Sequence, residues 1–198
     1  MRGVREEIVR RYYHALCDQR QGRVDADTVY KVELLMNQAG VSPESRRVAA
    51  AALDRAASTG FPAAAIELPD GQIITGKTSS LLGASAAVLL NALKALGGIN
   101  HDMHLISPII IEPIQNLKIK HLGNHNPRLH TDEILIALSI CAATNPTAEL
   151  AMRQLPKLRG CEAHSSVILS QVDDSVFRKL GINLTCEPKY QTKKLYHK

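Results

Sequence analysis

The sequence predicts an α/β fold, in which a mixed sheet with a β-hairpin is covered by helices and preceded by an N-terminal helical segment. Three observations predict it. Residues 1–60 show only helical periodicity, residues 63–76 follow a strand, turn and strand pattern, and strands and helices alternate through the rest of the chain. We expect a helical segment over residues 1–60, an α/β domain over residues 61–188 and a basic tail over residues 189–198.

Three helices are expected before any strand. The first spans residues 4–20, where apolar residues recur about every four positions on one helical face. The second begins after Asp25 and ends at Gly40. The third should begin at residues 42–44, which combine an N-cap serine, a first-turn proline and an acid that suits the positive helix end, and should run to Gly60.

A β-hairpin is expected next. Residues 63–68 and 72–76 favour strands, and Pro-Asp-Gly at residues 69–71 favours the turn between them. A strongly apolar helix follows over residues 81–96, and its small residues allow it to lie close on a sheet. Residues 105–111 are β-branched and apolar apart from Ser-Pro, which predicts a buried strand that the proline interrupts or ends.

The remaining elements alternate. A helix is expected from Thr131, and Asn145-Pro146 should end it and cap the next helix, which continues to Leu158. Residues 163–169 favour a strand, and Ser170 to Asp173 form a capping-box-like start to a helix that closes at Gly181. Residues 182–186 form the last expected strand.

Residues 71–78 match the phosphate-loop string G-x-x-x-x-G-K-[ST], in which backbone N–H groups cradle phosphates. The context favours a hairpin arm instead, because Gly71 completes a turn and the residues after it favour a strand. Between a strand end and a helix start, Lys77, Thr78, Ser79 and Ser80 remain candidate ligand-binding residues for an anion. The alternative is that Ser79 or Ser80 simply caps the helix.

Cys161 and His164 are the candidate catalytic residues, the thiol as nucleophile and the imidazole as base, with Ser165 beside them as a candidate ligand-binding residue. The alternative is that Cys161 is a small buried residue. No metal site is expected, since no companion ligand pair accompanies Cys161 and His164. The sequence assigns no cofactor.

Further candidate ligand-binding residues are His104, in a polar loop, and Thr144 and Asn145, at a junction between helices. Capping alone explains much of the junction. His121, His125 and His130 lie in a polar loop that could bind a metal or a phosphate, although surface loops often carry histidines without a role.

Composition bounds the location and the partners. The four cysteines are scattered and no signal peptide or membrane-spanning run is visible, so a cytoplasmic location and no membrane partner are expected. The net charge of +5 owes much to the C-terminal lysines, and aromatic residues are few. A nucleic-acid partner is therefore not expected.

Eight stretches of the chain carry a family resemblance, namely residues 8–13, 67–77, 84–87, 104–108, 142–147, 160–161, 163–165 and 178–182. They resemble one uncharacterised bacterial family, known as domain of unknown function 1846 and uncharacterised protein family 0371. Its members are more than twice as long, and their N-terminal half carries a glycine-rich segment that looks like a phosphate-binding loop. The resemblance implies that this chain is a C-terminal part whose partner is a missing N-terminal domain, and it supplies no reaction.

Two functions follow from these observations. In the first, the longer protein acts on or binds a phosphate-containing small molecule, and the polar candidates converge at one sheet edge to close over it. In the second, the chain is a structural or oligomerisation domain without catalytic residues of its own, and it assembles as a homo-oligomer.

Overall fold

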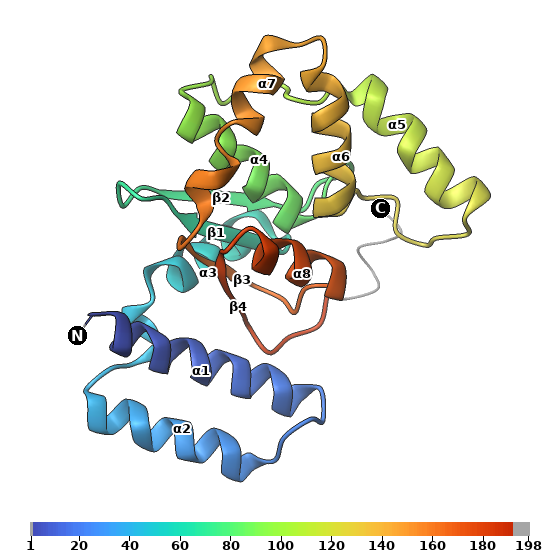
Figure 1. Cartoon of the computed structure of the whole chain (residues 1–198). Coiled ribbons are helices and arrows are strands. Elements are labelled where there is room, and N and C mark those ends of the chain that lie inside the picture. Colours follow the sequence, from blue (N-terminus) through green and yellow to red (C-terminus); the bar gives the residue numbers. More distant parts are fainter. Residues whose placement is uncertain (1, 192–198) are drawn as a thin grey trace.

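One four-stranded sheet lies between two sets of helices (Figure 1). The computed structural model describes residues 2–191. The strand order is β2-β1-β3-β4. Strand β1 (Ala63–Glu67) is antiparallel to both β2 (Ile73–Lys77) and β3 (Glu162–Ser165), whereas β3 is parallel to β4 (Asn183–Cys186). The mixed sheet, the hairpin and the helices that precede them confirm the predicted α/β fold class.

The phosphate-loop-like string forms the second arm of the hairpin. Ala63 pairs with Lys77 at one end of the β1–β2 ladder, and Glu67 pairs with Ile73 at the other. The turn is closed by the Gly71 N–H, which donates to the Leu68 carbonyl at 2.8 Å, and Gly71 has a φ of 86°. This left-handed conformation is the one that glycine adopts without a steric penalty. Gly71 therefore serves the turn, as the sequence predicts.

Helices α1 (Arg2–Arg20) and α3 (Arg47–Thr59) cover one face of the sheet, and α2 (Ala26–Ala39) packs on the outside of α1 (Figure 1). Val48 and Ala52 of α3 bury the side chain of Ala65 on β1. The rings of Tyr13 on α1 and His164 on β3 pack in a T-shaped arrangement, with 4.7 Å between the ring centroids.

Helix α3 begins later than the sequence predicts. A 3₁₀ turn occupies Pro43–Ser45, and Arg46 has an extended backbone before the helix begins at Arg47. The extended residue aims its guanidinium at the sheet, where Nη2 donates to the carbonyl of Ala163 at 2.8 Å. The cap sequence at residues 42–44 therefore begins the 3₁₀ turn and not α3, because the extended backbone of Arg46, which directs its side chain to β3, separates the turn from the helix.

The opposite face carries α4 (Ala84–Gly97) and α8 (Gln171–Lys179), and α6 (Thr131–Ala142) and α7 (Pro146–Met152) lie beyond α4. A 3₁₀ turn, Leu155–Leu158, leads into β3. The main core lies here and includes the fully buried side chains of Ile66, Leu89 and Phe177. Gly76 allows α4 to approach β2, since a Cβ at this position would lie 2.3 Å from the Val88 nitrogen.

The strand predicted over residues 105–111 is wrong. These residues end a loop and begin α5 (Pro108–Asn116), which continues into a π-helical turn, Leu117–His121. The hydroxyl of Ser107 accepts from the Ile109 N–H, and Pro108 stands in the first turn, where its missing N–H costs nothing. Helix-start chemistry therefore overrides the strand preference of three consecutive isoleucines.

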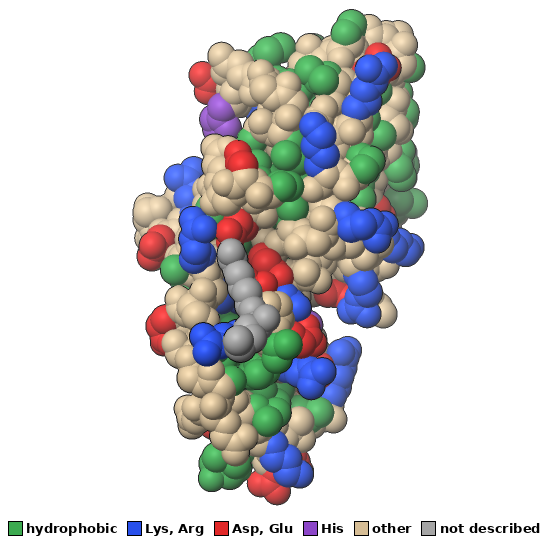
Figure 2. Space-filling model, turned by 60° about the vertical axis from the view of Figure 1, so that its left-hand side comes forward, with side chains coloured by type: hydrophobic (Ala, Val, Ile, Leu, Met, Phe, Trp, Pro, Cys, Tyr) green, Lys and Arg blue, Asp and Glu red, His purple; other side chains and the backbone are tan. Residues whose placement is uncertain are grey.

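Basic and acidic side chains are interspersed on the molecular face in Figure 2, with hydrophobic side chains scattered between them. None of the helices in the described part of the chain is both long and apolar enough to span a membrane. The predicted basic tail lies outside the described residues from position 192 onward.

Candidate functional site

A cavity of about 340 Å³ opens where the segments after β2 and β3 meet the loop that precedes α6. The loop is held to the start of α4 by two backbone hydrogen bonds, which make up one parallel β-bridge. Leu82 and Leu129 form an isolated parallel bridge, the Leu129 N–H donates to the Leu81 carbonyl at 3.0 Å, and the Gly83 N–H donates to the Leu129 carbonyl at 3.3 Å. These contacts bring Arg128 and His130 beside the first turn of α4.

The cavity wall includes the N-terminal end of α4. Its N-cap, Gly83, is extended and supplies no side-chain hydrogen bond, and Ala84 and Ser85 follow it on the cavity wall. The first N–H groups of a helix have no intrahelical partner and carry the positive end of the helix dipole. The start of this 14-residue helix is thus available to an anion.

Arg128 is the buried cation of the cavity. The residue is 5% exposed, and its Nε donates to the Ser79 carbonyl at 2.5 Å. Its Nη1 is buried and has no hydrogen-bond partner among the residues that the structure describes. Within residues 2–191, no carboxylate forms an ion pair with Arg128. A buried guanidinium without a counter-ion is unfavourable, so the site is electrostatically incomplete.

Asp173, the other buried charge at the cavity, is fully engaged. One carboxylate oxygen accepts from the N–H and the hydroxyl of Thr131 at 2.9 and 2.7 Å, and the other accepts from Ser85 Oγ at 2.9 Å. His130 Nδ1 lies 3.4 Å from that second oxygen. Burial alone would raise the pKa of Asp173, but the hydrogen bonds from His130 and Thr131 lower it to about 2. The hydrogen bond to Asp173 in turn raises the pKa of His130.

Comparison with known proteins shows the family to which the chain is related. The model of the family described as "Domain of unknown function DUF1846, C-terminal" matches residues 44–196. The chain belongs to this family. The UPF0371 proteins of Streptococcus pyogenes serotype M5 (strain Manfredo) and Corynebacterium glutamicum (strain R) are each 55% identical to it over 194 residues. That match covers 98% of this chain and 39% of the length of each relative. The resemblance to the family is confirmed.

The residues predicted to hold an anion after β2 contribute unequally to the cavity of this family member. Thr78 is buried on its wall. Ser79 supplies the carbonyl that holds Arg128, and its hydroxyl accepts from the N–H groups of Leu81 and Leu82. Ser80 is exposed, and the Lys77 ammonium lies 5.2 Å from the centre of the Phe61 ring. Gly83, and neither of the two serines, occupies the N-cap position of α4.

Cys161 and His164 are not brought together, because positions 161 and 164 face opposite sides of the sheet. The Cys161 thiol donates to the Lys157 carbonyl at 3.6 Å, and burial raises its pKa. A thiol with a raised pKa and no imidazole beside it lacks the activation that a nucleophile requires. Ser165, on the Cys161 side, is fully buried and donates to the Val167 carbonyl at 2.7 Å.

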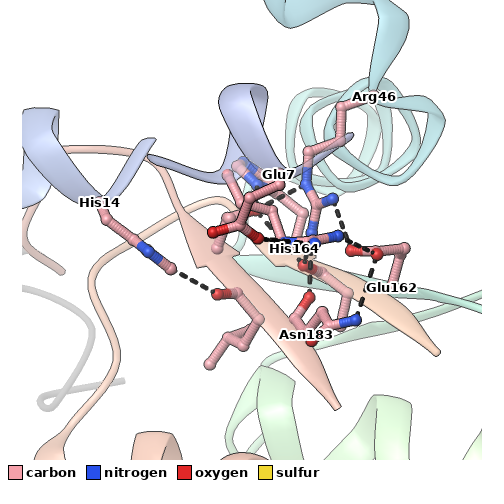
Figure 3. A network of polar contacts seen from close by, with 10 residues as sticks. Glu7, His14, Arg46, Glu162, His164 and Asn183 are labelled. Carbon is pink, nitrogen blue, oxygen red and sulfur yellow. Dashed lines mark hydrogen bonds and ion pairs between the residues drawn. The ribbon is translucent and has the colours of Figure 1, made fainter. Parts of the chain in front are cut away.

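His164 belongs to a polar network that joins α1, the start of α3 and two strands (Figure 3). Its Nδ1 lies 2.7 Å from Thr185 Oγ1, and its Nε2 lies 3.0 Å from Glu187 Oε1. Burial lowers its pKa, against the opposing effect of Glu187. In the same network Glu162 binds both Arg46 and Arg10. The arrangement fixes the layers to each other and leaves His164 without access to a substrate.

His104, Thr144 and Asn145 line no part of the cavity. All three are exposed, and the Asn145 side chain caps α7 by accepting from the Thr147 N–H at 2.9 Å. Of the predicted ligand-binding residues, therefore, Thr78 lies on the cavity wall and Ser79 supports it, whereas His104, Thr144 and Asn145 lie elsewhere.

Sequence reasoning missed Arg128, Ser85 and the second role of Asp173. Ser170 caps α8, because its Oγ accepts from the Asp173 N–H, but the Asp173 carboxylate reaches α6 and α4 instead of completing a capping box. One signal was available for α4. The residue before Ala84 is glycine, which lacks the side-chain oxygen that serine, threonine, aspartate or asparagine supplies at an N-cap.

Proposed function

We propose that this chain is the C-terminal, ligand-binding part of a longer protein and that it binds a phosphate-containing small molecule in the cavity beside α4. One observation carries the proposal, namely the buried Nη1 of Arg128, which has no partner in the described part of the chain. The lengths of the relatives support a longer protein, since this chain spans only 39% of the length of the relatives it matches. We also propose that the longer protein has a further domain on the N-terminal side of this one.

The chemistry of the cavity suits a phosphoryl group better than a cation. Arg128 brings a positive charge and guanidinium N–H groups beyond the Nε that binds Ser79, and the N–H groups at the start of α4 can donate to further phosphate oxygens. Asp173 does not supply a binding position for a cation, because its oxygens already accept from Thr131 and Ser85. Within the described residues no group of three or more metal-ligating side chains is present.

Titration of the complete protein with inorganic phosphate and pyrophosphate tests the proposal. Replacement of Arg128 by glutamine should weaken binding roughly 10- to 100-fold, the loss expected for hydrogen bonds to a charged group. R128K, which keeps the charge and loses the paired donors, should fall between R128Q and the wild type. R11Q is the matched control, because Arg11 is 63% exposed and lies on α1.

Isothermal titration calorimetry measures the affinities, and the melting temperature of each variant without ligand shows whether it is folded. Equal affinity of the wild type and both Arg128 variants would contradict the proposal. Absence of binding to either anion by the folded wild type would do the same.

The second candidate function is an oligomerisation domain. Ile136 and Ile140 lie four residues apart on α6 and are 61% and 65% exposed, while Ile109 at the start of α5 is 80% exposed. Exposed apolar side chains at helical spacing favour a contact with another chain. Sedimentation of the complete protein at micromolar concentration decides this case, and a monomer would exclude a homo-oligomer.

Catalysis by Cys161 and His164 forms no part of the proposal, because their side chains face opposite sides of the sheet. The predicted cytoplasmic location remains a proposal. The four cysteines are free thiols, as that location supposes.

A further inference from the structure

A second, larger cleft adjoins the proposed phosphate cavity. Its volume is about 690 Å³, and it lies between the C-terminal half of α1, the segment after β3, α8 and the outer edge of β4. Three residues, Gln21, Ile168 and Leu169, line both the cleft and the cavity. The two spaces are therefore neighbours, with these residues in the walls of both.

The floor of the cleft is the edge of β4, whose outward carbonyls are already satisfied. The ring of His14 contacts the Leu184 carbonyl through Nε2 at 3.0 Å, and Cys17 Sγ donates to the Cys186 carbonyl at 3.2 Å. An added peptide strand would have to displace both α1 side chains. The edge is thus poorly suited to recruiting a strand and leaves the space above it to a small molecule.

The walls of the cleft are polar and electrically balanced. Two ion pairs stand on its rim, one between Arg178 and Asp174 at 2.7 Å and one between Arg23 and Asp18 at 3.6 Å. The side chains of Gln21, Gln171 and Ser175 also line it, and within the described chain no hydrogen bond engages them. Amides and hydroxyls of this kind both donate and accept, as sugar hydroxyls do.

Among the described residues that line the cleft there is no phenylalanine, tyrosine or tryptophan, and the ring of His14 is held by the Leu184 carbonyl. A nucleobase is commonly held by stacking on an aromatic ring, so this described lining offers no free platform for one. Its volume falls within the range of roughly 300–1,000 Å³ that is typical of small-molecule sites. An inorganic phosphate in the adjoining cavity would leave this cleft empty.

We propose that the ligand is a phosphorylated sugar or polyol, whose phosphate lies at Arg128 and the start of α4 and whose hydroxyl-bearing part lies in the cleft between α1 and α8. This inference rests on the proposed function, because it supposes that the phosphate occupies the smaller cavity. It adds the chemical class of the non-phosphate part of the ligand and names the protein residues that recognise this part.

The test compares three probes by calorimetry on the complete protein: inorganic phosphate, ribose 5-phosphate and AMP. Ribose 5-phosphate should bind at least about tenfold more tightly than phosphate, and AMP should gain nothing over ribose 5-phosphate. The double variant Q171A/S175A should lose this tenfold gain and keep the wild-type affinity for phosphate. Q38A is the matched control, because Gln38 is an exposed glutamine on the distant helix α2.

The outcomes separate the two proposals. Phosphate binding that depends on Arg128, together with equal affinity for phosphate and ribose 5-phosphate, would overturn the sugar inference and leave the proposed function intact. AMP binding more tightly than ribose 5-phosphate would also overturn it, in favour of a nucleotide. Failure of all three probes to bind in an Arg128-dependent manner would overturn both.

Discussion

Asp173 is the residue at which three helices meet. It lies on α8, accepts from the N-terminal Thr131 of α6, and accepts from Ser85 in the first turn of α4. A single carboxylate thus caps another helix and fixes the mutual position of the helix starts around the cavity. The hydrogen bonds from Thr131, Ser85 and His130 stabilise this carboxylate in its ionised form.

The contact between Asp173 and His130 makes the stability of the fold depend on pH. The pKa of Asp173 is lowered to about 2 from 3.8, so its stabilisation is complete above pH 3.8 and is lost as pH falls through 2. The pKa of His130 is raised, so its contribution is complete below its ordinary value of 6.5 and is lost as pH rises through the folded value. Together they stabilise the fold most between about pH 4 and 6.

We expect D173N to lose roughly 2 kcal/mol of unfolding free energy near pH 5 and to lose less as the pH approaches 2. Urea denaturation at a series of pH values measures the difference from the wild type. D174N is the control, because Asp174 is 44% exposed in an ion pair within α8 and its loss should change little. A difference that stays constant across the acidic range would refute the assignment.

The two glycines of the phosphate-loop-like string serve different physical needs. At Gly76 a Cβ would lie 2.3 Å from the backbone of Val88, whereas at Gly71 nothing lies within 4 Å and only the positive φ disfavours other residues. G76A should therefore cost about 3 kcal/mol or prevent folding, and G71A about 1 kcal/mol. Thermal and urea denaturation rank them. Loss of phosphate binding by a stable G71A variant would instead revive the phosphate-loop interpretation.

At the scale of elements, local chemistry predicted most of the fold. The Pro-Asp-Gly turn identified the hairpin, and Asn145 identified the junction of α6 and α7. The strand prediction for residues 105–111 was wrong because strand preference and helix-start signals compete in this segment. Ile109 and its two isoleucine neighbours favour a strand, but Ser107 and Pro108 before them begin a helix.

The cap of α7 separates structural and ligand roles for Asn145. The helix has seven residues, so loss of the cap hydrogen bond should cost about 1 kcal/mol in N145A. N145D keeps the acceptor oxygen and should retain the wild-type stability. T144A is a neutral control, because Thr144 is exposed and caps nothing. Stability comes from urea denaturation, and a ligand role would show as weaker ligand binding by a fully stable N145D.

At the scale of the whole molecule, the cavity joins segments that are distant in the sequence. Arg128 is 49 positions from Ser79, whose carbonyl holds it, and Ser85 is 88 positions from Asp173. Neither pair has a spacing that local pattern reasoning can detect. The same holds for Arg46, whose guanidinium binds Glu162 across 116 positions. Sequence therefore predicted the elements around the site but not the contacts that make it.

The predicted division at residue 60 separates a helical segment from an α/β domain, and the contacts across it indicate cooperative unfolding. Arg46 is 7% exposed and donates to Glu162, to Thr185 and to the Ala163 carbonyl, while Val48 and Ala52 cover Ala65. Removal of residues 1–60 would leave Glu162 without its cations and one face of the sheet open to water. Removal of residues 1–40 keeps both Arg46 and α3.

We therefore expect a chain of residues 41–198 to unfold cooperatively at a lower urea concentration than residues 1–198, because it loses Arg10 and the Tyr13 contact with His164. A chain of residues 61–198 should show no cooperative transition, since the exposed sheet face and the unpaired Glu162 act together. Circular dichroism during urea denaturation compares the three chains. If residues 61–198 unfold cooperatively at the midpoint of residues 1–198, the first 60 residues form a separate unit and α3 is dispensable to the sheet.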